Sequence, residues 1–408
     1  MTLIRPFAGL RPVDDRAADV IAPPYDVLNS AEARNLAQDR PWSFLHISRA
    51  EIDLPEGTNP YNPLVYETAA ANLARMETAG ILRRDSSPCY YVYQLVMGEH
   101  RQTGLVAVAS VSEYNSNRIR KHEFTRPDKE DDRVRQIEAL NAQTGPVLLA
   151  YRAQASVDGL LEAVTHTQPV VDLVSDDGIG HRLWVISDDA LIRRISGAFD
   201  AMEALYIADG HHRSAAASRV AANRVGRGAD SSAAYFLAVI FPHDQMKILD
   251  YNRVVRDLNG MSPETFLAGL SDNFSVSPVS AACHPAGPGE FGMYLAGQWY
   301  RLTIYPDRVP ADPVARLDVS LLADNLLAPV LGITDPRRDQ RIDFVGGIRG
   351  LGGLERRVDS GEMQVAFSMY ATRMEDLMAV ADAGEVMPPK STWFEPKLAD
   401  GLVSHVLD

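Results

Sequence analysis

A short polar run between two apolar segments contains the residue types that bind phosphate. Residues 209–214 read Asp-Gly-His-His-Arg-Ser, and they stand between the apolar run Ala204–Ala208 and an alanine-rich run. A glycine at this place lets the backbone turn sharply and approach a ligand, and Ser214 is expected to cap the following helix. The N–H groups and the dipole of a helix N-terminus attract anions. The run therefore predicts a phosphate site formed by Gly210, His211, Arg213 and Ser214.

The side chains of this run favour ligand binding over a purely structural corner. Arg213 carries a planar guanidinium that can bind phosphate oxygens at two positions, and His211 and His212 would project into a cleft. The alternative is that these three side chains only solvate a corner. Neighbouring histidines rarely point at one ion, and no His-x-x-x-His spacing accompanies them, so we expect no direct histidine ligation of a metal. Mg²⁺ could still arrive bound to phosphate oxygens.

A second polar run, residues 118–135, is basic within an acidic chain. It contains seven bases against five acids, a local surplus of +2. Lys121 and Arg126 are candidates to neutralise phosphate charge, and Glu123 is the candidate base that accepts a hydroxyl proton during phosphoryl transfer. Asp209 is the rival for that role, and His212 completes the predicted catalytic set. The alternative is a solvated turn whose charges pair along the helix that follows.

Two further segments are candidates for contacts with a substrate. Two prolines fix the backbone before Tyr25 and Asp26, so both polar groups would project from a rigid turn. A structural turn that starts a helix is the alternative. Met387–Lys397 contains prolines that exclude a regular helix, and it could form either a lid over a nucleotide or acidic substrate or a buried structural loop. The lid candidates are Lys390, Ser391 and Thr392.

Strands and helices must interleave to position these residues. Short apolar, β-branched or aromatic runs predict strands, and longer runs that end at glycine predict helices. Trp42–Arg49 alternates as a strand would. The pattern predicts a mixed α/β (α+β) fold rather than a regular βαβ repeat. The strands are predicted at Tyr90–Met97, Gly104–Val111, Pro146–Tyr151, Arg182–Ile186, Ala204–Ala208 and Ala233–Phe241, and the helices at Tyr66–Ala79, Asp131–Gln143 and Ser214–Val225.

A new series of predicted helices and strands begins near residue 256. A helix at Pro263–Leu270, a hairpin through Phe291–Tyr305 and an apolar helix at Leu317–Leu331 follow. We therefore divide the chain into a nucleotide-binding catalytic region, residues 1–255, and a C-terminal α/β region, residues 256–408, that contributes the possible lid.

Charge and cysteine content exclude several classes of protein. Acids outnumber bases 54 to 40, and a net charge of −14 disfavours general binding to nucleic acid or to anionic membranes. Two cysteines far apart in the sequence exclude a disulfide framework and a cysteine-rich zinc site. No apolar run approaches the roughly 18 residues that span a bilayer. We expect a cytoplasmic protein whose partners are a nucleotide and a small molecule, with a homo-oligomer left open.

Asp209-Gly210-His211-His212-Arg213, followed by an alanine-rich run, resembles the phosphate-binding box of the ParB/sulfiredoxin superfamily. Free serine kinases of that superfamily have a closely similar Asp-Gly-His-His-Arg signature. The resemblance implies a ParB/sulfiredoxin-like core with an additional α/β C-terminal region, ATP or ADP with Mg²⁺ as cofactors, and a kinase reaction. Sulfiredoxins place a reactive cysteine after the glycine, where this chain has His211, so sulfinic-acid reduction is not supported.

Over nearly its whole length the chain also resembles a family known as domain of unknown function 1015, whose name implies no chemistry. The matching stretches begin at Arg5, Ala22, Lys121, Asp343 and Met387. Together the residues and the resemblances predict a nucleotide-dependent phosphotransferase that acts on a small hydroxylated metabolite, with free L-serine as the first candidate. The alternative is a regulatory switch that binds CTP or ATP without metabolite chemistry.

Overall fold

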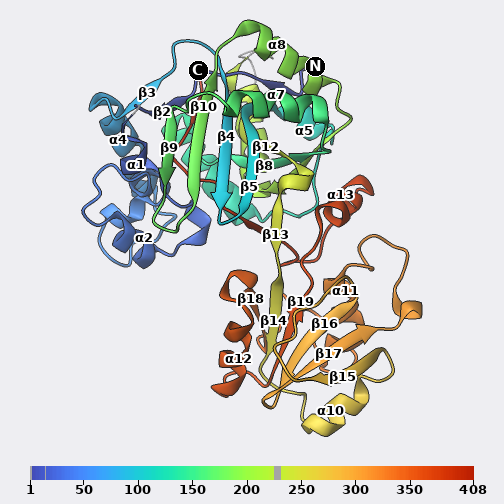
Figure 1. Cartoon of the computed structure of the whole chain (residues 1–408). Coiled ribbons are helices and arrows are strands. Elements are labelled where there is room, and N and C mark those ends of the chain that lie inside the picture. The colour runs from blue at the N-terminus through green and yellow to red at the C-terminus, as the bar shows by residue number, and fades with distance from the viewer. Residues whose placement is uncertain (1, 14, 225–230) are drawn as a thin grey trace. The chain divides into compact units, whose positions relative to one another are not determined.

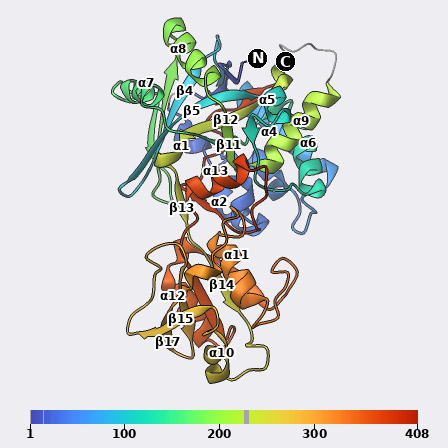
Figure 2. The ribbon, with the colours of Figure 1, turned by 90° about the vertical axis from the view of Figure 1, so that its right-hand side faces the viewer.

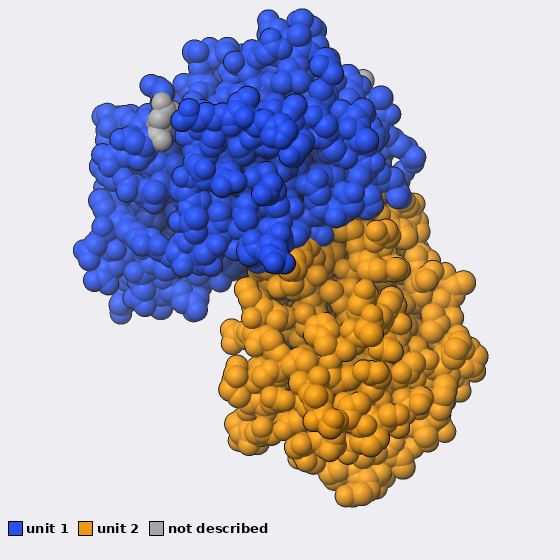
Figure 3. All heavy atoms as spheres, in the orientation of Figure 1, with its two compact units in different colours: residues 1–246, 396–408 blue, residues 247–395 orange. Residues whose placement is uncertain are grey.

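The computed structural model describes residues 2–13, 15–224 and 231–408 (Figure 1). Within them the chain packs as two compact units, unit 1 of residues 1–246 and 396–408 and unit 2 of residues 247–395 (Figure 3). The sequence analysis assigned all of residues 256–408 to one region, whereas here residues 396–408 return to unit 1. The predicted helix end at Val225 lies outside the described residues.

Unit 1 is built around a mixed sheet of nine strands in its described part. Their order is β6-β11-β8-β12-β5-β4-β10-β9, with β1 paired to β5, and the β11–β6 and β12–β8 pairs are parallel. The strands are β1 (Ile4–Arg5), β4 (Tyr90–Met97), β5 (His100–Ser110), β6 (Ile119–Arg120), β8 (Val147–Tyr151), β9 (Val171–Val174), β10 (Gly180–Ile186), β11 (Leu205–Asp209) and β12 (Tyr235–Pro242).

The helices of unit 1 pack against this sheet and against one another. One face of the sheet shares a hydrophobic core with α7 and α8, and Figure 2 shows α9 beside α6. A second core joins the N-terminal helices α1 to α4. The helices are α1 (Ala17–Val20), α2 (Ser30–Ala37), α3 (Leu45–Ser48), α4 (Pro63–Thr78), α5 (Val111–Asn115), α6 (Pro127–Leu140), α7 (Ala155–Thr165), α8 (Asp189–Asp200) and α9 (His211–Asn223).

The mixed α/β class is confirmed, and so are the strands expected from apolar runs, each within a few residues of its predicted bounds. Other predictions differ from the structure. Trp42–Arg49 contains the short helix α3 rather than a strand, because Leu45 and Ile47 pack into the helical N-terminal core. The helix α6 ends at Leu140, three residues before its predicted end at Gln143, because Asn141 takes the left-handed conformation at φ 49° and supplies the C-cap.

The C-terminal segment, residues 396–408, is threaded through unit 1. Ala22 and Asp400 form an antiparallel bridge, as do Leu10 and Ser404. Strand β21 (His405–Val406) pairs with β7 (Ala142–Gln143), directly after α6. Leu407 is 0% exposed and packs between α6 and α9. The segment therefore completes the core of unit 1 and ties its N-terminal part to the sheet region.

Unit 2 has an antiparallel sheet of six strands in the order β15-β17-β16-β19-β14-β18. Its helix α12 (Leu351–Asp359) packs against this sheet, and α11 (Asp318–Leu322) runs directly into a π-helical turn at Ala323–Leu327. The other elements of the unit are β13 (Lys247–Leu249), β14 (Tyr251–Val255), α10 (Pro263–Gly269), β15 (Phe274–Val279), β16 (Glu290–Leu295), β17 (Gln298–Ile304), β18 (Ile342–Gly346), β19 (Val365–Met369), α13 (Met374–Asp382) and β20 (Trp393–Glu395).

Among the described residues, no helix has the length and apolar character that crossing a membrane requires.

Truncation of Leu407 to alanine is expected to lower the free energy of unfolding of unit 1 by about 2–5 kcal/mol, because it empties a fully buried site between α6 and α9. Urea denaturation followed by circular dichroism measures the change. Val309→Ala, at an exposed valine, is the control and should shift stability by less than about 0.5 kcal/mol. A small effect of Leu407→Ala would show that the C-terminal segment is peripheral to folding.

Candidate functional site

The polar run at residues 209–214 forms a tight corner between β11 and α9, here called the β11–α9 corner. Gly210 is the N-cap of α9 at φ 99°. A Cβ on this glycine would lie 3.1 Å from Nε of Arg213 and 3.3 Å from Cα of Val147, so a side chain would be strained by the backbone conformation and would be in tight contact with both residues. The corner therefore brings the start of α9 close to the chain that leads into β8.

The helix begins three residues earlier than predicted, which changes the place of Ser214. Ser214 does not cap α9. It lies inside the first turn, fully buried, and its hydroxyl donates to the carbonyl of His211 at 3.0 Å. In the described part of the chain, no acceptor is hydrogen-bonded to the backbone N–H groups of His211, His212 and Arg213. These N–H groups, rather than the serine hydroxyl, are the donors that the helix start offers to an anion.

His211 is buried beside a second histidine and a carboxylate. Its Nε2 accepts the backbone N–H of His122 at 3.3 Å, which leaves the proton of the neutral ring on Nδ1, 3.6 Å from Oε2 of Glu123. The rings of His122 and His211 meet edge to face with centroids 4.4 Å apart. Burial lowers the pKa of His122 to about 4 and holds the pKa of His211 well below its ordinary value. Both imidazoles are therefore neutral at pH 7.

His212 and two basic residues also lie near the helix start. The backbone N–H of Arg126 donates to Nε2 of His212 at 3.0 Å, and the side chain of Arg126 pairs with Asp128. Burial lowers the pKa of His212, so this ring is also neutral. The ammonium of Lys121 lies 4.0 Å from the ring centroid of Tyr114, and burial lowers its pKa as well. The structure thus places His212, Arg126 and Lys121 near the corner.

The side chain of Arg213 is only 10% exposed, and it is bound to the protein itself. One guanidinium nitrogen donates to the carbonyl of Pro146, and another lies 3.6 Å from Asp209 and 3.8 Å from Asp26. Burial opposes the charge of Arg213, and the carboxylates of Asp209 and Asp26 nevertheless raise its pKa above the ordinary value. The guanidinium that was predicted to bind phosphate is therefore already engaged, in part, by two carboxylates and a carbonyl.

Asp209 lies between two cations. Its carboxylate is 3.6 Å from Arg213 and 3.6 Å from the ammonium of Lys397, which belongs to the C-terminal segment. Burial would raise the pKa of Asp209, but these two cations hold it below the usual range. Among the described residues, no group of three or more His, Cys, Asp or Glu side chains is arranged to hold a metal ion.

A small cavity adjoins Arg213 on its buried side. It has a volume of about 30 Å³ and is lined by Tyr25, Arg133, Gln136 and Asp400, among others. Asp400 is 2% exposed, and its Oδ1 has no hydrogen-bond partner in the described structure. Burial raises the pKa of Asp400 to about 7, against the opposing effect of Arg213. Sequence reasoning missed Asp400, because nothing near it in the sequence marks it as part of this site.

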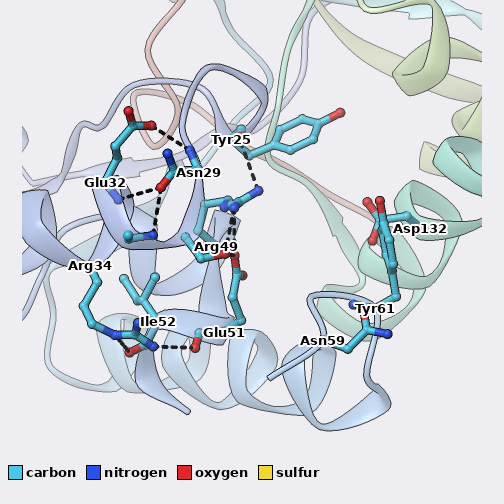
Figure 4. Close-up of polar contacts among 12 residues, drawn as sticks. Tyr25, Asn29, Glu32, Arg34, Arg49, Glu51, Ile52, Asn59, Tyr61 and Asp132 are labelled. Carbon is cyan, nitrogen blue, oxygen red and sulfur yellow. Dashed lines mark hydrogen bonds and ion pairs between the residues drawn. The ribbon is translucent and has the colours of Figure 1, made fainter. Parts of the chain in front are cut away.

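The turn that carries Tyr25 and Asp26 is held from below by Arg49 (Figure 4). The guanidinium of Arg49 donates to the carbonyl of Tyr25 at 3.4 Å and pairs with Glu51 at 2.9 Å. The side chain of Arg133 stacks on the Tyr25 ring at 3.9 Å. The helix that follows is capped by Asn29 rather than by Asp26, so Asp26 is left to face Arg213.

The three predicted lid residues belong to unit 2. Lys390 has a left-handed backbone at φ 60°, and its carbonyl accepts a hydrogen bond from Arg253 at 3.0 Å. The hydroxyl of Ser391 donates to the carbonyl of Pro388 at 2.5 Å, and the carbonyl of Ser391 accepts from Thr372 at 2.8 Å. These contacts give the loop that contains Thr392 a fixed shape within its own unit.

Comparisons with known proteins place the chain in a family without an assigned activity. A family profile described as "Protein of unknown function (DUF1015)" matches residues 4–320. No curated protein matches the chain. Solved structures that match include a free serine kinase in complex with AMP, at 13% identity and TM-score 0.36, over 73% of this chain and 92% of that one. A conserved hypothetical protein from Pyrococcus furiosus matches at 14% identity and TM-score 0.34, over 73% and 95%. SbnI from Staphylococcus aureus matches at 12% identity and TM-score 0.36, over 72% and 85%.

Gly210→Ala is expected to lower the free energy of unfolding by about 2 kcal/mol, because alanine is strained at this left-handed position and meets Arg213 and Val147. Gly197→Ala is the matched control. A Cβ at Gly197 meets nothing within 4 Å inside α8, so the same change should stabilise by about 0.5–1 kcal/mol. Urea denaturation measures the change in the free energy of unfolding for each variant. A change in the same direction for both variants would contradict the assigned geometry of the corner.

Asp400→Asn is expected to stabilise the protein more at pH 8 than at pH 4. The pKa of Asp400 is raised from 3.8 to about 7 on folding, so the stability of the wild type falls as pH rises through that interval. Asparagine does not titrate, so the difference between the two proteins should grow by up to about 4 kcal/mol between pH 4 and 8. Urea denaturation at pH 4, 6 and 8 measures it. A difference that is constant over these pH values would show that Asp400 is not a buried acid.

Proposed function

We propose that this chain, which belongs to the DUF1015 family, is a nucleotide-dependent phosphotransferase that acts on a small hydroxylated metabolite. The β11–α9 corner would hold the nucleotide phosphates. The single observation that carries this proposal is the open start of the thirteen-residue helix α9 beside the Glu123–His211 pair. The N–H groups at the helix start can bind an anion, and the carboxylate of Glu123 can accept a proton close to that anion.

Phosphate binding at the corner is supported by three unpartnered N–H groups and by the charges around them. The N–H groups of His211, His212 and Arg213 begin a helix long enough to carry a full dipole. Gly210 removes the Cβ that would otherwise stand at this position. Lys121 lies close enough to His211 to help lower its pKa, and Lys397 lies 3.6 Å from Asp209, so positive charge partly offsets the carboxylates of the site.

Proton transfer is supported by the state of the histidines. His211 is neutral, its proton faces Glu123, and Glu123 is itself 57% exposed. A carboxylate in this position can accept the hydroxyl proton of an acceptor while His211 orients it. Asp209 remains the rival base, because its depressed pKa keeps it ionised. The cations beside Asp209, however, also weaken it as a base.

Arg213 acts in this proposal as a positioning residue. It holds Asp26 and Asp209 in place and fixes the start of α9 against Pro146. Tyr25 and Asp26 stand on a turn that Arg49 and Arg133 hold in place, which suits the positioning of a small polar substrate. Free L-serine is the first candidate acceptor, because the Asp-Gly-His-His-Arg signature resembles that of free serine kinases.

ATP or ADP is the proposed donor, with Mg²⁺ bound through phosphate oxygens. The corner fits such a complex better than it fits a bare ion, because the carboxylates of Asp26 and Asp209 are already engaged by Arg213 and Lys397. Mg²⁺ bridging phosphate oxygens supplies charge neutralisation in phosphoryl transfer. The ParB/sulfiredoxin-like nature of this core, and a cytoplasmic location, are parts of the same proposal.

One observation favours a second candidate, a switch that binds CTP or ATP without metabolite chemistry. Lys397 of the C-terminal segment pairs with Asp209 directly beside the proposed phosphate site. Phosphates bound there would compete with Asp209 for Lys397, and the C-terminal segment would be held differently in the two states. This candidate predicts nucleotide-dependent hydrogen exchange in residues 396–408 and no phosphorylated product.

Glu123→Gln is expected to lower turnover by about 10²–10⁴-fold, because it removes the group that accepts the proton. The purified protein would be incubated with Mg²⁺, ATP or ADP, and L-serine, and O-phosphoserine would be followed by phosphorus NMR. The nucleotide-induced rise in melting temperature should be retained in the variant. Glu264→Gln, at an exposed glutamate of unit 2, is the matched control and should leave turnover unchanged.

Three outcomes separate the alternatives. Loss of turnover in Asp209→Asn but not in Glu123→Gln would show that Asp209, rather than Glu123, accepts the proton. A nucleotide-induced stabilisation without phosphorylation of L-serine or of other small alcohols would favour the switch. No stabilisation by any nucleotide at about 5 mM would refute both candidates, because a ligand at 100 times its Kd adds about 2.7 kcal/mol, and about 5 mM is 100 times a Kd of about 50 μM.

A further inference from the structure

Unit 2 contains a cavity of its own, larger than the one beside Arg213. Its volume is about 170 Å³. A dry cavity of about 150 Å³ in another protein is large enough to hold a benzene molecule. The walls come from β14, β18, α11, the π-helical turn after it and the loop before β20, and they include Val319, Ser320, Ala323, Leu327, Phe344, Pro388 and Pro389.

Arg253 of β14 reaches this cavity and is 4% exposed. Its guanidinium donates to the carbonyls of Tyr251 and Lys390, the latter at 3.0 Å, and lies 5.3 Å from the ring centroid of Phe344. Among the described residues, no carboxylate lies within ion-pair distance of it. Burial lowers the pKa of Arg253 to about 10, and no carboxylate opposes this effect.

An unpaired buried guanidinium is an expensive feature for a fold to retain. The effective penalty for burying an ion is several kcal/mol, and it is normally offset by a partner of opposite charge. The two carbonyls satisfy some of the N–H groups but supply no net charge. A methionine would fill the same space on β14 without this cost. Because no described carboxylate of the unit lies within ion-pair distance of Arg253, an anionic ligand in the cavity could supply the partner that this charge lacks.

The rest of the cavity indicates what carries that charge. Its walls are largely apolar, which suits an organic body rather than an inorganic ion. Asp324 and Asp335 also line it, and the second basic residue at the cavity, Arg337, is already paired with Asp335 at 2.9 Å. A single available cation with two acids nearby matches one negative charge and disfavours the two charges of a phosphate monoester.

The surrounding backbone is shaped to keep this cavity open. The π-helical turn at Ala323–Leu327 widens the helix where it lines the cavity, and such turns often occur at functional sites. On the opposite wall, Lys390 is in the left-handed conformation and Ser391 is bonded to Pro388, which fixes the proline pair. The loop that the sequence analysis proposed as a lid is thus a wall of this cavity.

We propose that unit 2 binds a small organic carboxylate with an apolar body, with the carboxylate paired to Arg253 and the body against Phe344 and Leu327. The site is independent of the nucleotide site proposed for unit 1, so either proposal can fail without the other. Its ligand is a monoanion of about the size of benzoate.

Titration calorimetry and thermal shift of the full chain test this proposal with benzoate as the probe. Benzamide, a neutral molecule of the same shape, and phenyl phosphate, a dianion, are the comparison ligands. We expect benzoate to bind at least tenfold more tightly than either. In Arg253→Met the affinity for benzoate should fall at least tenfold, and the melting temperature without ligand should stay the same or rise, because a buried unpaired charge is removed.

Two further variants keep the test decisive. Arg349→Met makes the same substitution at an exposed arginine of unit 2 and should leave benzoate binding unchanged. Ala323→Phe fills the cavity while Arg253 remains, and it should abolish binding even if Arg253→Met does not fold. Absence of benzoate binding to the wild type, together with a lower melting temperature of Arg253→Met, would overturn the proposal and make Arg253 a strut between two carbonyls. Tighter binding of phenyl phosphate would overturn the monoanion assignment.

Discussion

The buried guanidinium of Arg213 is the interaction on which the candidate site depends. It joins the start of α9 to the chain before β8 through Pro146, and it faces Asp209 at the end of β11 and Asp26 on the N-terminal turn. Without this cation, the carboxylates of Asp26, Asp209 and Asp400 would repel one another with no opposite charge of Arg213 to offset them. Burial is the main cause that raises the pKa of Asp400 to about 7, and the charge of Asp26 adds to it.

Around this charge centre the corner separates two kinds of chemistry. The start of α9 presents N–H groups and is close to Lys121, which favours anions. The buried histidines are neutral and connect the helix start to Glu123. Burial therefore does more here than stabilise a core. It fixes which groups are charged at pH 7, and so which of them could bind phosphate and which could move a proton.

Each unit contains a buried arginine, and the two differ in their partners. Arg213 is surrounded by carboxylates of its own unit, which raise its pKa and make it a part of the framework. In the described structure, Arg253 donates to two carbonyls and lies beside an aromatic ring, and burial lowers its pKa to about 10. The same side chain thus organises one site and, by our proposal, awaits a ligand in the other.

The sequence by itself determined the elements whose signal is local. The apolar run Tyr90–Met97 is strand β4 within its predicted bounds, and the corner at Gly210 forms between a strand and a helix because only glycine suits that backbone. Local alternation misled at Trp42–Arg49, where packing into the N-terminal core selects a helix. The predicted capping role of Ser214 was wrong because α9 starts at His211, and the left-handed Gly210 is the N-cap.

Only the tertiary structure decided that Asp26, Asp209, Lys397 and Asp400 surround Arg213. Those residues are separated by up to several hundred positions, and no periodicity or propensity records a distance that the folded chain alone creates.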